Sequence, residues 1–527
     1  MPKNLRVKTS EYIDETNRVS FKFNGKSYYG FKGDTLASAL LANDVHLVGR
    51  SFKYHRPRGI MTAGSEEPNA IVQVNDNTDR SEPNVRATEI EIYEGLEASS
   101  QNCWPNVNFD IGGINNVISP FLPAGFYYKT FMWPASFWEK YEYFIRHSAG
   151  LGKSPKEKDP DVYDHKYIHC DVLVVGAGIS GILAAKNAAK NNLKTLLVDE
   201  KNEIGGATIY QNREFNKIEA QSSSDWLKKE IEELKNVKNL EVKVRTSVAA
   251  YHGYNYLLAR ENLTDHLEKK DKQGKIRQRL LKIRAKKVIL ATGALERPLI
   301  FNNNDRPGIM LSSAVNKYAD FYGVVCGQKT VFFTNNDSAY ESAFCLHNKG
   351  IKVEAIIDIR DNSNSKIVKA VEDAGIKIHW SHTVVDTSGY KRLKNISVMK
   401  LSNDGMSVTG NRIKISSDCL GVSGGWSPAV HLFTQSGGKL SFDEENKVFL
   451  PNKYPSEQIS IGSCNGDFEI SEIIKNLSKK LKEFLKIEQT DFDNISVDSD
   501  YDRSKRNIWL LPSDKPVGKT KPFVDYQ

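Results

Sequence analysis

The sequence has few of the residue groupings that build metal sites and hydrolytic active sites. Its six cysteines are scattered along 527 residues, with no CxxC pair and no cysteine and histidine spacing suited to zinc or an iron–sulfur cluster. It contains no HExxH motif and no local serine, histidine and aspartate signature. We therefore expect neither a catalytic residue nor a metal ligand in this chain.

Long apolar runs are also missing. No stretch of about 18 uninterrupted apolar residues occurs, and the N-terminus lacks the apolar core of a signal peptide. Basic residues exceed acidic ones only slightly, 73 against 65, and the lysines are spread along the chain. We therefore expect a soluble, cytoplasmic protein with reduced thiols that contacts neither membrane nor nucleic acid.

The most informative segment is DVLVVGAGISGILAAKNAAKNNLKTLLVDEKNEIGG, residues 171–206. A short apolar strand leads into Gly176-x-Gly178-x-x-Gly181, a helix of small residues follows, and a second strand ends at Asp199. These glycines make a tight turn, let the backbone approach a pyrophosphate and let the helix pack on the strand, while the acid accepts hydrogen bonds from ribose hydroxyls. The pattern predicts a bound adenine dinucleotide, and the acid favours NAD or FAD over NADP.

Two later segments resemble other parts of the same nucleotide-binding domain. An apolar strand ends in an Ala-Thr-Gly turn at 291–293, where flavoproteins with two dinucleotide domains bring the backbone close to the cofactor. The strand near 459–462 leads into a glycine-rich segment that resembles the late flavoprotein motif beside the ribityl chain. The candidate nucleotide-binding residues are Gly176, Gly178, Ser180, Gly181, Asp199, Glu200, Gly205, Gly206, Thr292, Gly293, Gly462, Gly466 and Asp467.

A second strand, helix and strand unit occurs at 329–360, but its turn is different. The turn reads Thr334-Asn335-Asn336-Asp337 and has no glycine. Without glycine the backbone cannot come close to a pyrophosphate, and Asp337 would repel it. We expect this second unit to be structural.

The order of patterns predicts an α/β protein. Alternating residues around Asn24-Gly25 indicate a β-hairpin, and Asp34-Thr35 is a helix cap. We expect a ferredoxin-like β-grasp domain without a cluster, followed by a two-domain FAD/NAD(P)-binding Rossmann-like fold. The expected parts are a β-grasp domain at 1–100, an aromatic and proline-rich arm at 101–168, a dinucleotide-binding domain at 169–323 and 416–475, an inserted second nucleotide-binding-like domain at 324–415, and a C-terminal segment at 476–527.

Several ordered segments together resemble one family. They are GRSFKYHRPRGIMTAGSEEPNAIVQV (49–74), FLPAGFYYKTFMWPASFW (121–138), VLVVGAGISG (172–181), LLVDE (196–200) and ILATGALERPLIFNNNDRPGIM (289–310). This set is similar to the α subunit of heterotetrameric sarcosine oxidase. The resemblance implies that the chain binds NAD and works with a β subunit, and with γ and δ subunits. It implies that sarcosine is oxidised to glycine and formaldehyde on FAD of the β subunit, with electrons passing through an FMN between α and β to oxygen.

A basic stretch at 50–58 is the candidate contact with this FMN. It holds five basic residues interleaved with Phe52 and Tyr54. Because a guanidinium group pairs bidentately with phosphate, we expect Arg56 and Arg58 to contact the FMN phosphate. A solvated basic turn is the alternative.

Two departures from the family pattern limit what the resemblance implies. Residues 61–66 contain no cysteine where cluster-carrying relatives supply thiolates, which favours the oxidase branch. Full α subunits are much longer and end in a folate-binding domain, so folate chemistry is not expected of this chain, which is either truncated or the product of a split gene. The alternatives are a self-contained FAD-dependent NAD(P)H oxidoreductase, the α subunit of a related amino-acid or opine dehydrogenase, and a non-catalytic scaffold.

Overall fold

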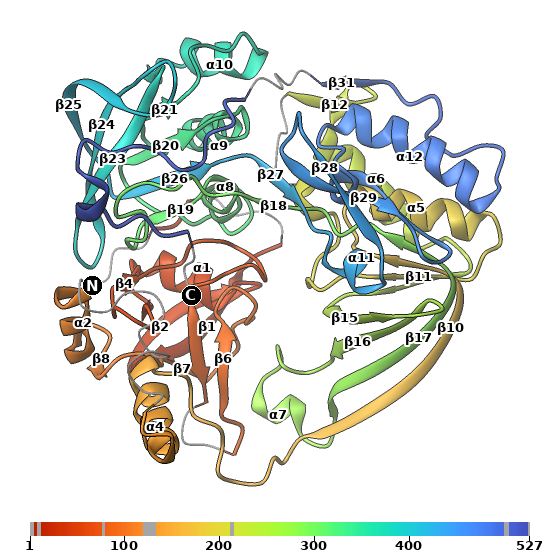
Figure 1. Ribbon diagram of the computed structural model, residues 1–527. Helices are drawn as coiled ribbons and strands as arrows, with labels where there is room; N and C mark the ends of the chain where they lie inside the picture. Colours follow the sequence, from red (N-terminus) through yellow and green to blue (C-terminus); the bar gives the residue numbers. More distant parts are fainter. Residues whose placement is uncertain are drawn as a thin grey trace.

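The computed structural model describes residues 5–7, 12–75, 79–119, 133–210, 215–499 and 505–524. Three packed units are visible in Figure 1: an N-terminal unit in red and orange, a first nucleotide-binding-like unit at the right, and a second one in green and cyan at the top. One apolar core cluster extends through all three units. Part of the expected aromatic arm, residues 120–132, lies outside the described residues.

The N-terminal unit is a five-stranded sheet in the order β2-β1-β7-β5-β6, with helix α1 packed on it. The first two strands form the expected hairpin through Asn24 and Gly25, which both have positive φ, as a two-residue hairpin turn requires. The Thr35 side chain accepts a hydrogen bond from the N–H of Ser38 and caps α1, as predicted. Its elements are β1 (Asp14–Phe23), β2 (Lys26–Lys32), α1 (Leu36–Ala42), β5 (Ile71–Val74), β6 (Glu82–Arg86) and β7 (Leu96–Ser100), with the short strands β3 (Gly49–Arg50) and β4 (Pro57–Arg58) beside them.

An arm of small elements follows the N-terminal unit. It contains β8 (Pro105–Asn106), β9 (Phe109–Asp110), α2 (Ile114–Val117) and α4 (Trp138–Ala149). Large apolar side chains of this arm are exposed to solvent, among them Trp104, Phe109, Val117, Trp133 and Phe144. The arm is therefore only partly covered by the rest of the described chain.

The first nucleotide-binding-like unit contains a seven-stranded sheet. Its order is β14-β11-β10-β17-β16-β15, and β30 pairs with the end of β17. Strands β14, β11, β10, β17 and β30 are parallel, which is the arrangement of a Rossmann-like core. The elements are β10 (Val162–Val175), α5 (Ile179–Lys190), β11 (Thr195–Val198), α6 (Ser223–Leu234), β14 (Leu240–Lys243), β15 (Thr246–His252), β16 (Tyr256–Asn262), β17 (Ile276–Leu290), β30 (Gln458–Ser460) and α12 (Ile470–Leu485).

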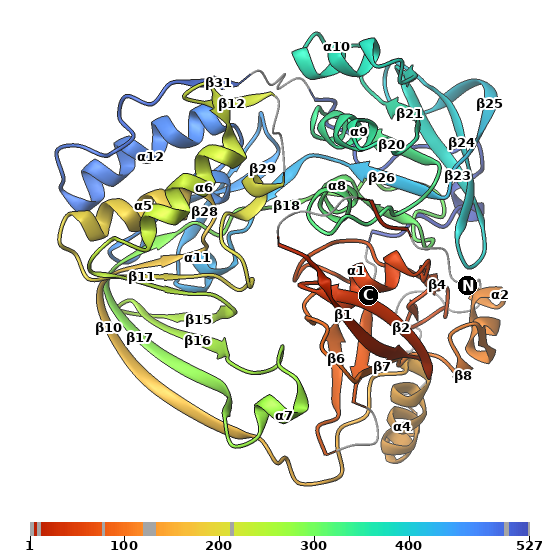
Figure 2. The same ribbon diagram turned by 180° about the vertical axis from the view of Figure 1, so that it is seen from behind.

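Strand β10 corrects one expected boundary. It begins at Val162, so the boundary expected between 168 and 169 falls inside a strand. Figures 1 and 2 show β10 and β17 as long curved neighbours that reach toward the N-terminal unit. The first part of β10 is mostly exposed and polar and is held by pairing with β17, which is why its sequence gave no apolar signal.

The second nucleotide-binding-like unit has a parallel sheet in the order β19-β26-β20-β21-β22 and an antiparallel sheet, β23-β24-β25. Its boundaries also differ from 324–415, because β19 and α8 come before that range and β26 comes after it. The elements are β19 (Ile309–Leu311), α8 (Ser312–Asp320), β20 (Thr330–Thr334), α9 (Ser338–Asn348), β21 (Val353–Asp358), α10 (Lys366–Asp373), β22 (Ile378–His379), β23 (His382–Gly389), β24 (Leu393–Leu401), β25 (Val408–Ser416) and β26 (Cys419–Ser423).

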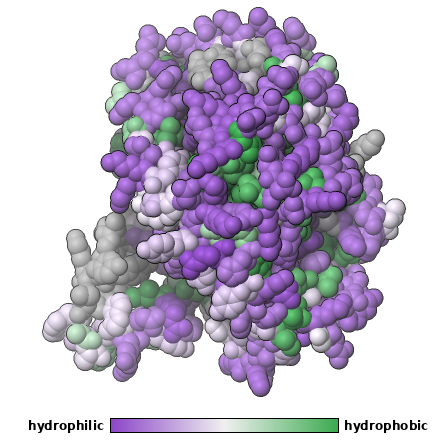
Figure 3. Space-filling model, turned by 90° about the vertical axis from the view of Figure 1, so that its right-hand side faces the viewer, coloured by the Kyte–Doolittle hydropathy of each residue, from purple (hydrophilic) through white to green (hydrophobic). Residues whose placement is uncertain are grey.

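The remaining elements connect and cover these units. They include β18 (Ala294–Glu296), which pairs with β27 (Trp426–Pro428), the hairpin of β28 (Lys439–Asp443) and β29 (Val448–Lys453), and α11 (His431–Gln435). A small sheet of β12 (Asn216–Ile218), β13 (Gln221–Ser222) and β31 (Val497–Ser499) and the short helix α7 (Lys269–Lys272) belong to the same set. The described C-terminal residues 505–524 run along the second unit and end near the arm, where Lys521 donates to Asn116. No helix in the described ranges is both long and apolar enough to cross a bilayer. The face in Figure 3 is largely hydrophilic, with scattered apolar patches.

Candidate functional site

The glycines between β10 and α5 differ in what surrounds them. At Gly176, with φ of +99°, an added Cβ would lie 2.3 Å from the carbonyl oxygen of Ala291. At Gly181 an added Cβ would lie 1.9 Å from the carbonyl oxygen of Gly176. Gly178 has open space beyond its Cα. Two glycines thus permit the turn and the packing of the helix, and the third leaves room for a ligand.

The start of α5 faces this open space. Gly178 is its N-cap and offers no side chain, so no side chain caps the N–H groups of the first turn. These groups and the positive end of the helix dipole favour a phosphate. Ser180 lies in the same turn and packs against the late glycine segment, since an added Cβ at Gly462 would lie 2.2 Å from its Oγ.

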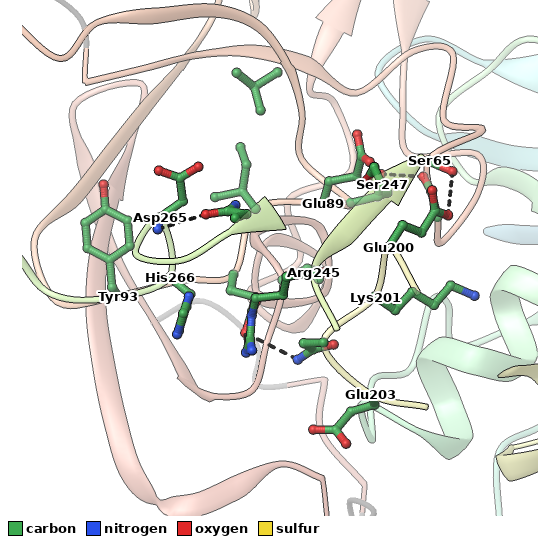
Figure 4. Close-up of a pocket in the computed structure, with 18 of the residues that line it drawn as sticks. Ser65, Glu89, Tyr93, Glu200, Lys201, Glu203, Arg245, Ser247, Asp265 and His266 are labelled. Atoms are coloured by element: carbon green, nitrogen blue, oxygen red, sulfur yellow. Dashed lines mark hydrogen bonds and ion pairs between the residues drawn. The ribbon is translucent and has the colours of Figure 1, made fainter. Parts of the chain in front are cut away.

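The acidic end of the motif is fixed by backbone donors. Oδ2 of Asp199 accepts from the N–H of Ala177 at 2.6 Å, and Oδ1 accepts from the N–H of Lys201 at 2.9 Å. Each carboxylate oxygen has a further lone pair for a ribose hydroxyl. Glu200 points to the N-terminal unit, where its Oε1 accepts from the hydroxyl of Ser65 at 2.9 Å (Figure 4).

These groups line one cavity of about 700 Å³. This volume is within the usual range of small-molecule and cofactor sites. Gly181 and Gly205 lie behind the wall and shape it, and Gly205 forms a backbone bridge with Gly178. The predicted residues that line the cavity are Gly176, Gly178, Ser180, Asp199, Glu200, Gly206, Thr292 and Gly293.

The late segment contributes neighbours of the predicted residues. Ser463 and Phe468 line the cavity, whereas Gly462, Gly466 and Asp467 are not part of its wall. The buried carboxylate of Asp467 accepts from Nδ2 of Asn476 at 2.6 Å. Gly466 has φ of +92° and ends the short helical turn. In this structure Asp467 therefore stabilises the segment instead of facing the cavity.

Arg56 and Arg58 do not form a solvated turn, because both side chains are buried. Nε and Nη2 of Arg56 each lie 2.7 Å from an oxygen of Asp305, and Arg58 also contacts this carboxylate. Burial favours the neutral acid, but the two guanidinium groups hold the pKa of Asp305 below its usual range. The ring of Phe523 covers both. The alternative of a solvated turn is wrong, and contact with an FMN phosphate stays a prediction that would require a guanidinium group to change partner.

The turn of the second unit is filled by its own side chains. Thr334, Asn335, Asn336 and Asp337 are all buried. Asn336 donates to the Ser423 hydroxyl at 3.2 Å, and Asp337 pairs with Arg360 at 2.8 Å. This side-chain network occupies the position that glycine leaves open in the first unit.

Other residues of the cavity wall come from parts of the chain that the motif does not include. Burial raises the pKa of Glu296 to about 7 and that of Glu341 to about 8. Despite its burial, Lys201 has a pKa above its usual value because of Tyr210 and Asp199. No sequence signal marks these residues, since distant segments assemble the wall. The additional wall residues include Ser65, Glu66, Lys201, Thr246, Val248, Glu296, Ser313, Asn316, Ser338, Glu341, Trp426 and His431.

A smaller cavity of about 220 Å³ lies between the N-terminal unit and the first nucleotide-binding-like unit (Figure 4). Ser65, Glu200 and Lys201 line both cavities. Glu91 and Arg245 form an ion pair across this boundary at 2.5 Å. The N-terminal unit is thus attached directly beside the acidic end of the nucleotide motif. Among the described residues, no group of three or more histidine, cysteine, aspartate or glutamate side chains is placed to hold a metal ion.

The open glycine turn, the uncapped helix start and the fixed acid define a dinucleotide-binding protein of the two-domain Rossmann type. Comparison with known families agrees. The chain belongs to the pyridine nucleotide-disulphide oxidoreductase family, whose model matches residues 170–455, more than half of the chain. Residues 16–103 match the 2Fe-2S iron-sulfur cluster binding domain. The expected α/β fold with an FAD/NAD(P)-binding part is confirmed.

The chain is also similar over almost its whole length to sarcosine oxidase α subunits. It is 39% identical to sarcosine oxidase subunit alpha of Rhizobium meliloti, over 98% of this chain and 50% of the relative. It is 33% identical to that of Corynebacterium sp. strain P-1, over 98% of this chain and 49% of the relative. The resemblance seen in the motifs is confirmed, and the chain spans about half the length of the curated relatives it matches.

One solved structure matches the fold across most of the chain. It is the L-proline dehydrogenase from P. horikoshii, with a TM-score of 0.57 and 18% identity, covering 94% of this chain and 80% of that one. At this identity the match supports the fold alone.

Proposed function

We propose that this chain is the dinucleotide-binding part of an α-type subunit in a sarcosine oxidase complex, and that its 700 Å³ cavity holds NAD. The observation that carries the proposal is the open space at Gly178, which lies next to the uncapped N-terminus of α5. The similarity to sarcosine oxidase α subunits supports the choice of complex.

The residues present fit a dinucleotide. The N–H groups at the start of α5 would bind the pyrophosphate, and Asp199 with Glu200 would bind the adenosine ribose. The filled turn at Asn336 and Asp337 argues against a second nucleotide in the second unit. That unit instead contributes Ser338 and Glu341 to the wall of the shared cavity.

The chemistry of the complex is assigned to its partners. We propose that a β subunit, with γ and δ subunits, oxidises sarcosine to glycine and formaldehyde with oxygen as acceptor, and that FMN lies between α and β. A nicotinamide ring, when bound, is a hydride carrier or a resident structural group. The described residues of this chain bind and orient the dinucleotide and close its cavity. A cytoplasmic location is part of the proposal.

We further infer that the N-terminal unit holds no iron–sulfur cluster. Cys103 is the only cysteine within residues 16–103, and a [2Fe–2S] centre needs four protein ligands, mostly thiolates. In the loop at 61–66 the buried carboxylate of Glu67, and not a cluster, holds the backbone in place. Oε2 of Glu67 accepts from the N–H groups of Met61 at 2.9 Å and Thr62 at 2.6 Å.

The proposal is tested by identifying what the purified chain carries. The chain is denatured, and its released small molecules are identified by mass spectrometry beside a visible spectrum of the intact protein. NAD without flavin is the expected result. Stoichiometric FAD would overturn it in favour of a self-contained FAD-dependent NAD(P)H oxidoreductase, and no bound nucleotide would favour a scaffold.

The substrate is tested in the complex. The chain is co-expressed with a flavin-binding β subunit, and oxidation of sarcosine, dimethylglycine, proline and an opine is measured both as oxygen uptake and as reduction of an artificial electron-accepting dye. Sarcosine is the expected substrate. Preference for proline or the opine would assign the chain to a related dehydrogenase.

A further inference from the structure

The N-terminal unit supplies part of the wall of the dinucleotide cavity. Ser65 and Glu66, in the loop between β4 and β5, line this cavity. The first nucleotide-binding-like unit contributes Asp199, Glu200 and Lys201 to the same wall, directly after β11, at the end proposed for the adenosine ribose. The cavity is therefore shared between the two units.

Hydrogen bonds on two sides fix this loop at the ribose end. The carbonyl oxygen of Ala63 accepts from Nζ of Lys317 on α8 at 2.9 Å. The hydroxyl of Ser65 donates to Oε1 of Glu200 at 2.9 Å (Figure 4). Because Glu66 directly follows Ser65, the loop holds Glu66 next to the segment that carries the ribose acid.

The carboxylate of Glu66 is accessible and unpaired within the described part of the chain. Glu66 is an exposed residue, and none of the hydrogen bonds and ion pairs of the described residues involves its side chain. In the same wall, Asp199, Glu200 and Glu296 each accept at least one hydrogen bond. Gly64 leaves room for Glu66, since an added Cβ at Gly64 would collide with its carboxylate. A ligand can therefore reach this acceptor without displacing a protein partner.

Lys201 lines the same wall with the opposite charge. Its N–H donates to Oδ1 of Asp199 at 2.9 Å, so its side chain starts at the ribose end. Its ammonium group likewise has no hydrogen bond or ion pair with any described residue. Burial disfavours the charge, but Tyr210, Asp199 and Glu66 outweigh this effect and hold its pKa above the usual value. The wall thus presents a charged donor and a charged acceptor that do not pair with each other.

We infer that Glu66 and Lys201 bind the adenosine ribose together with Asp199, so that the N-terminal unit completes the dinucleotide site. This inference rests on the proposed NAD site. A ribose presents two neighbouring hydroxyl groups, and each can donate one hydrogen bond and accept others. Asp199 accepts from one hydroxyl and Glu66 from the other, while the ammonium group of Lys201 donates to the hydroxyl oxygens. The pyrophosphate does not suit this end of the cavity, because the carboxylate of Glu66 would repel it.

The test measures affinities of the nucleotide-free full chain by isothermal titration calorimetry. The ligands are NAD and two NAD analogues, one without the 2′-hydroxyl and one without the 3′-hydroxyl of the adenosine ribose. We expect Glu66→Ala to weaken NAD binding about tenfold, because it removes a charged hydrogen-bond acceptor. For the analogue that lacks the hydroxyl bound by Glu66, the same substitution should change the affinity by less than about twofold. Lys201→Met removes the donor and should weaken NAD binding by about the same factor as Glu66→Ala.

Matched variants separate recognition of the ribose from attachment of the N-terminal unit. Glu66→Gln keeps an oxygen acceptor and should recover part of the lost affinity. Glu91→Ala breaks the ion pair with Arg245 across the boundary and should change the affinities for all three ligands by the same factor. Glu97→Ala, at an exposed glutamate of the same unit that pairs with Lys22, is the control and should change none of them.

The possible outcomes decide between a ribose contact and a structural role. Because Glu66 is exposed and has no described partner, Glu66→Ala should keep the melting temperature of the unmodified chain, which shows that the variant folds. Equal weakening of NAD and both analogues by Glu66→Ala, or no weakening at all, would overturn the inference. The same selective loss in Glu91→Ala would also overturn it, because attachment of the unit would then explain the effect. Failure of NAD and both analogues to bind the unmodified chain would overturn the proposed NAD site itself.

Discussion

The two Rossmann-like units have similar parallel sheets, but their first turns differ in whether side chains fill them. In the first unit the turn before α5 has open space at Gly178. In the second unit the turn before α9 is filled by Asn336 and Asp337, whose side chains are bound internally. The fold thus provides the place for a nucleotide, while the side-chain volume at the turn decides whether a nucleotide can bind there.

The acidic residues of the two units also differ in their partners, and this difference agrees with the difference in open space. Asp199 in the first unit is held by backbone N–H groups and has no cationic partner among the described hydrogen bonds and ion pairs, so it can accept from a ligand. Asp337 in the second unit is neutralised by Arg360, which also pairs with Asp358 at 2.8 Å. The second unit thus contributes to the wall of the first unit's cavity, and we propose that it binds no second nucleotide.

Filling the open turn should have the largest effect. In Gly178→Val the side chain would occupy the space left for the pyrophosphate, and the φ of −73° at this position is compatible with valine. We expect NAD affinity to fall about 1,000-fold, equivalent to about 4 kcal/mol, with an unchanged melting temperature of the nucleotide-free chain. Calorimetry and thermal unfolding check this result. Retention of NAD by the variant would show that the cavity is not its site.

Emptying the filled turn should affect stability instead of binding. Asp337→Ala removes one partner of the buried Arg360, and breaking a buried ion pair costs about 3 kcal/mol or more. We expect the free energy of unfolding, measured in urea, to fall by about this amount, while the folded protein keeps its NAD affinity. Lys235→Ala, at an exposed ion pair, is the control that should change little. Loss of nucleotide without loss of stability would reveal a nucleotide site in the second unit.

Neutralising the ribose acid should change selectivity. Asp199→Asn keeps the size of the side chain but removes the charge that repels a 2′-phosphate. We expect NAD affinity to fall about tenfold and the preference for NAD over NADP to shrink, because the charged acceptor makes the stronger hydrogen bonds to ribose. Dissociation constants for both nucleotides measure the effect. Unchanged values for both would remove Asp199 from the site.

The local parts of this comparison were predictable from the sequence, because they depend on neighbours in the chain. The three glycines, the acid after β11 and the glycine-free turn could be recognised from spacing and steric rules alone. The hairpin at Asn24-Gly25 and the cap at Thr35 follow from the same kind of local rule.

Long-range pairing explains what the sequence did not predict. Arg56 pairs with Asp305, 249 residues away, so the basic stretch belongs to an internal ion cluster, and its contact with an FMN phosphate stays a prediction. Ser65 and Asn316 reach the cavity from other units, and β19 and β26 join the second sheet from outside the expected range. Nothing in the local pattern at these positions records a partner that lies so far along the chain.

The smallest expected effect concerns Glu341, which the second unit contributes to the shared cavity. Burial raises its pKa from 4.5 to about 8, so between these values the folded chain holds a proton that the unfolded chain has lost. The free energy of unfolding therefore loses this contribution as the pH rises through that window. Glu341→Gln removes the titration, and we expect its free energy of unfolding relative to the unmodified chain to increase by about 1 kcal/mol between pH 5 and pH 6. Urea unfolding at both values measures the difference. Burial lowers the pKa of Lys317 to about 7, so its titration raises the free energy of unfolding as the pH rises. This contribution is the same in both proteins and cancels from the difference between them. A difference that stays constant with pH would show that Glu341 titrates as an ordinary exposed acid, and that the second unit does not bury its carboxylate against the cavity.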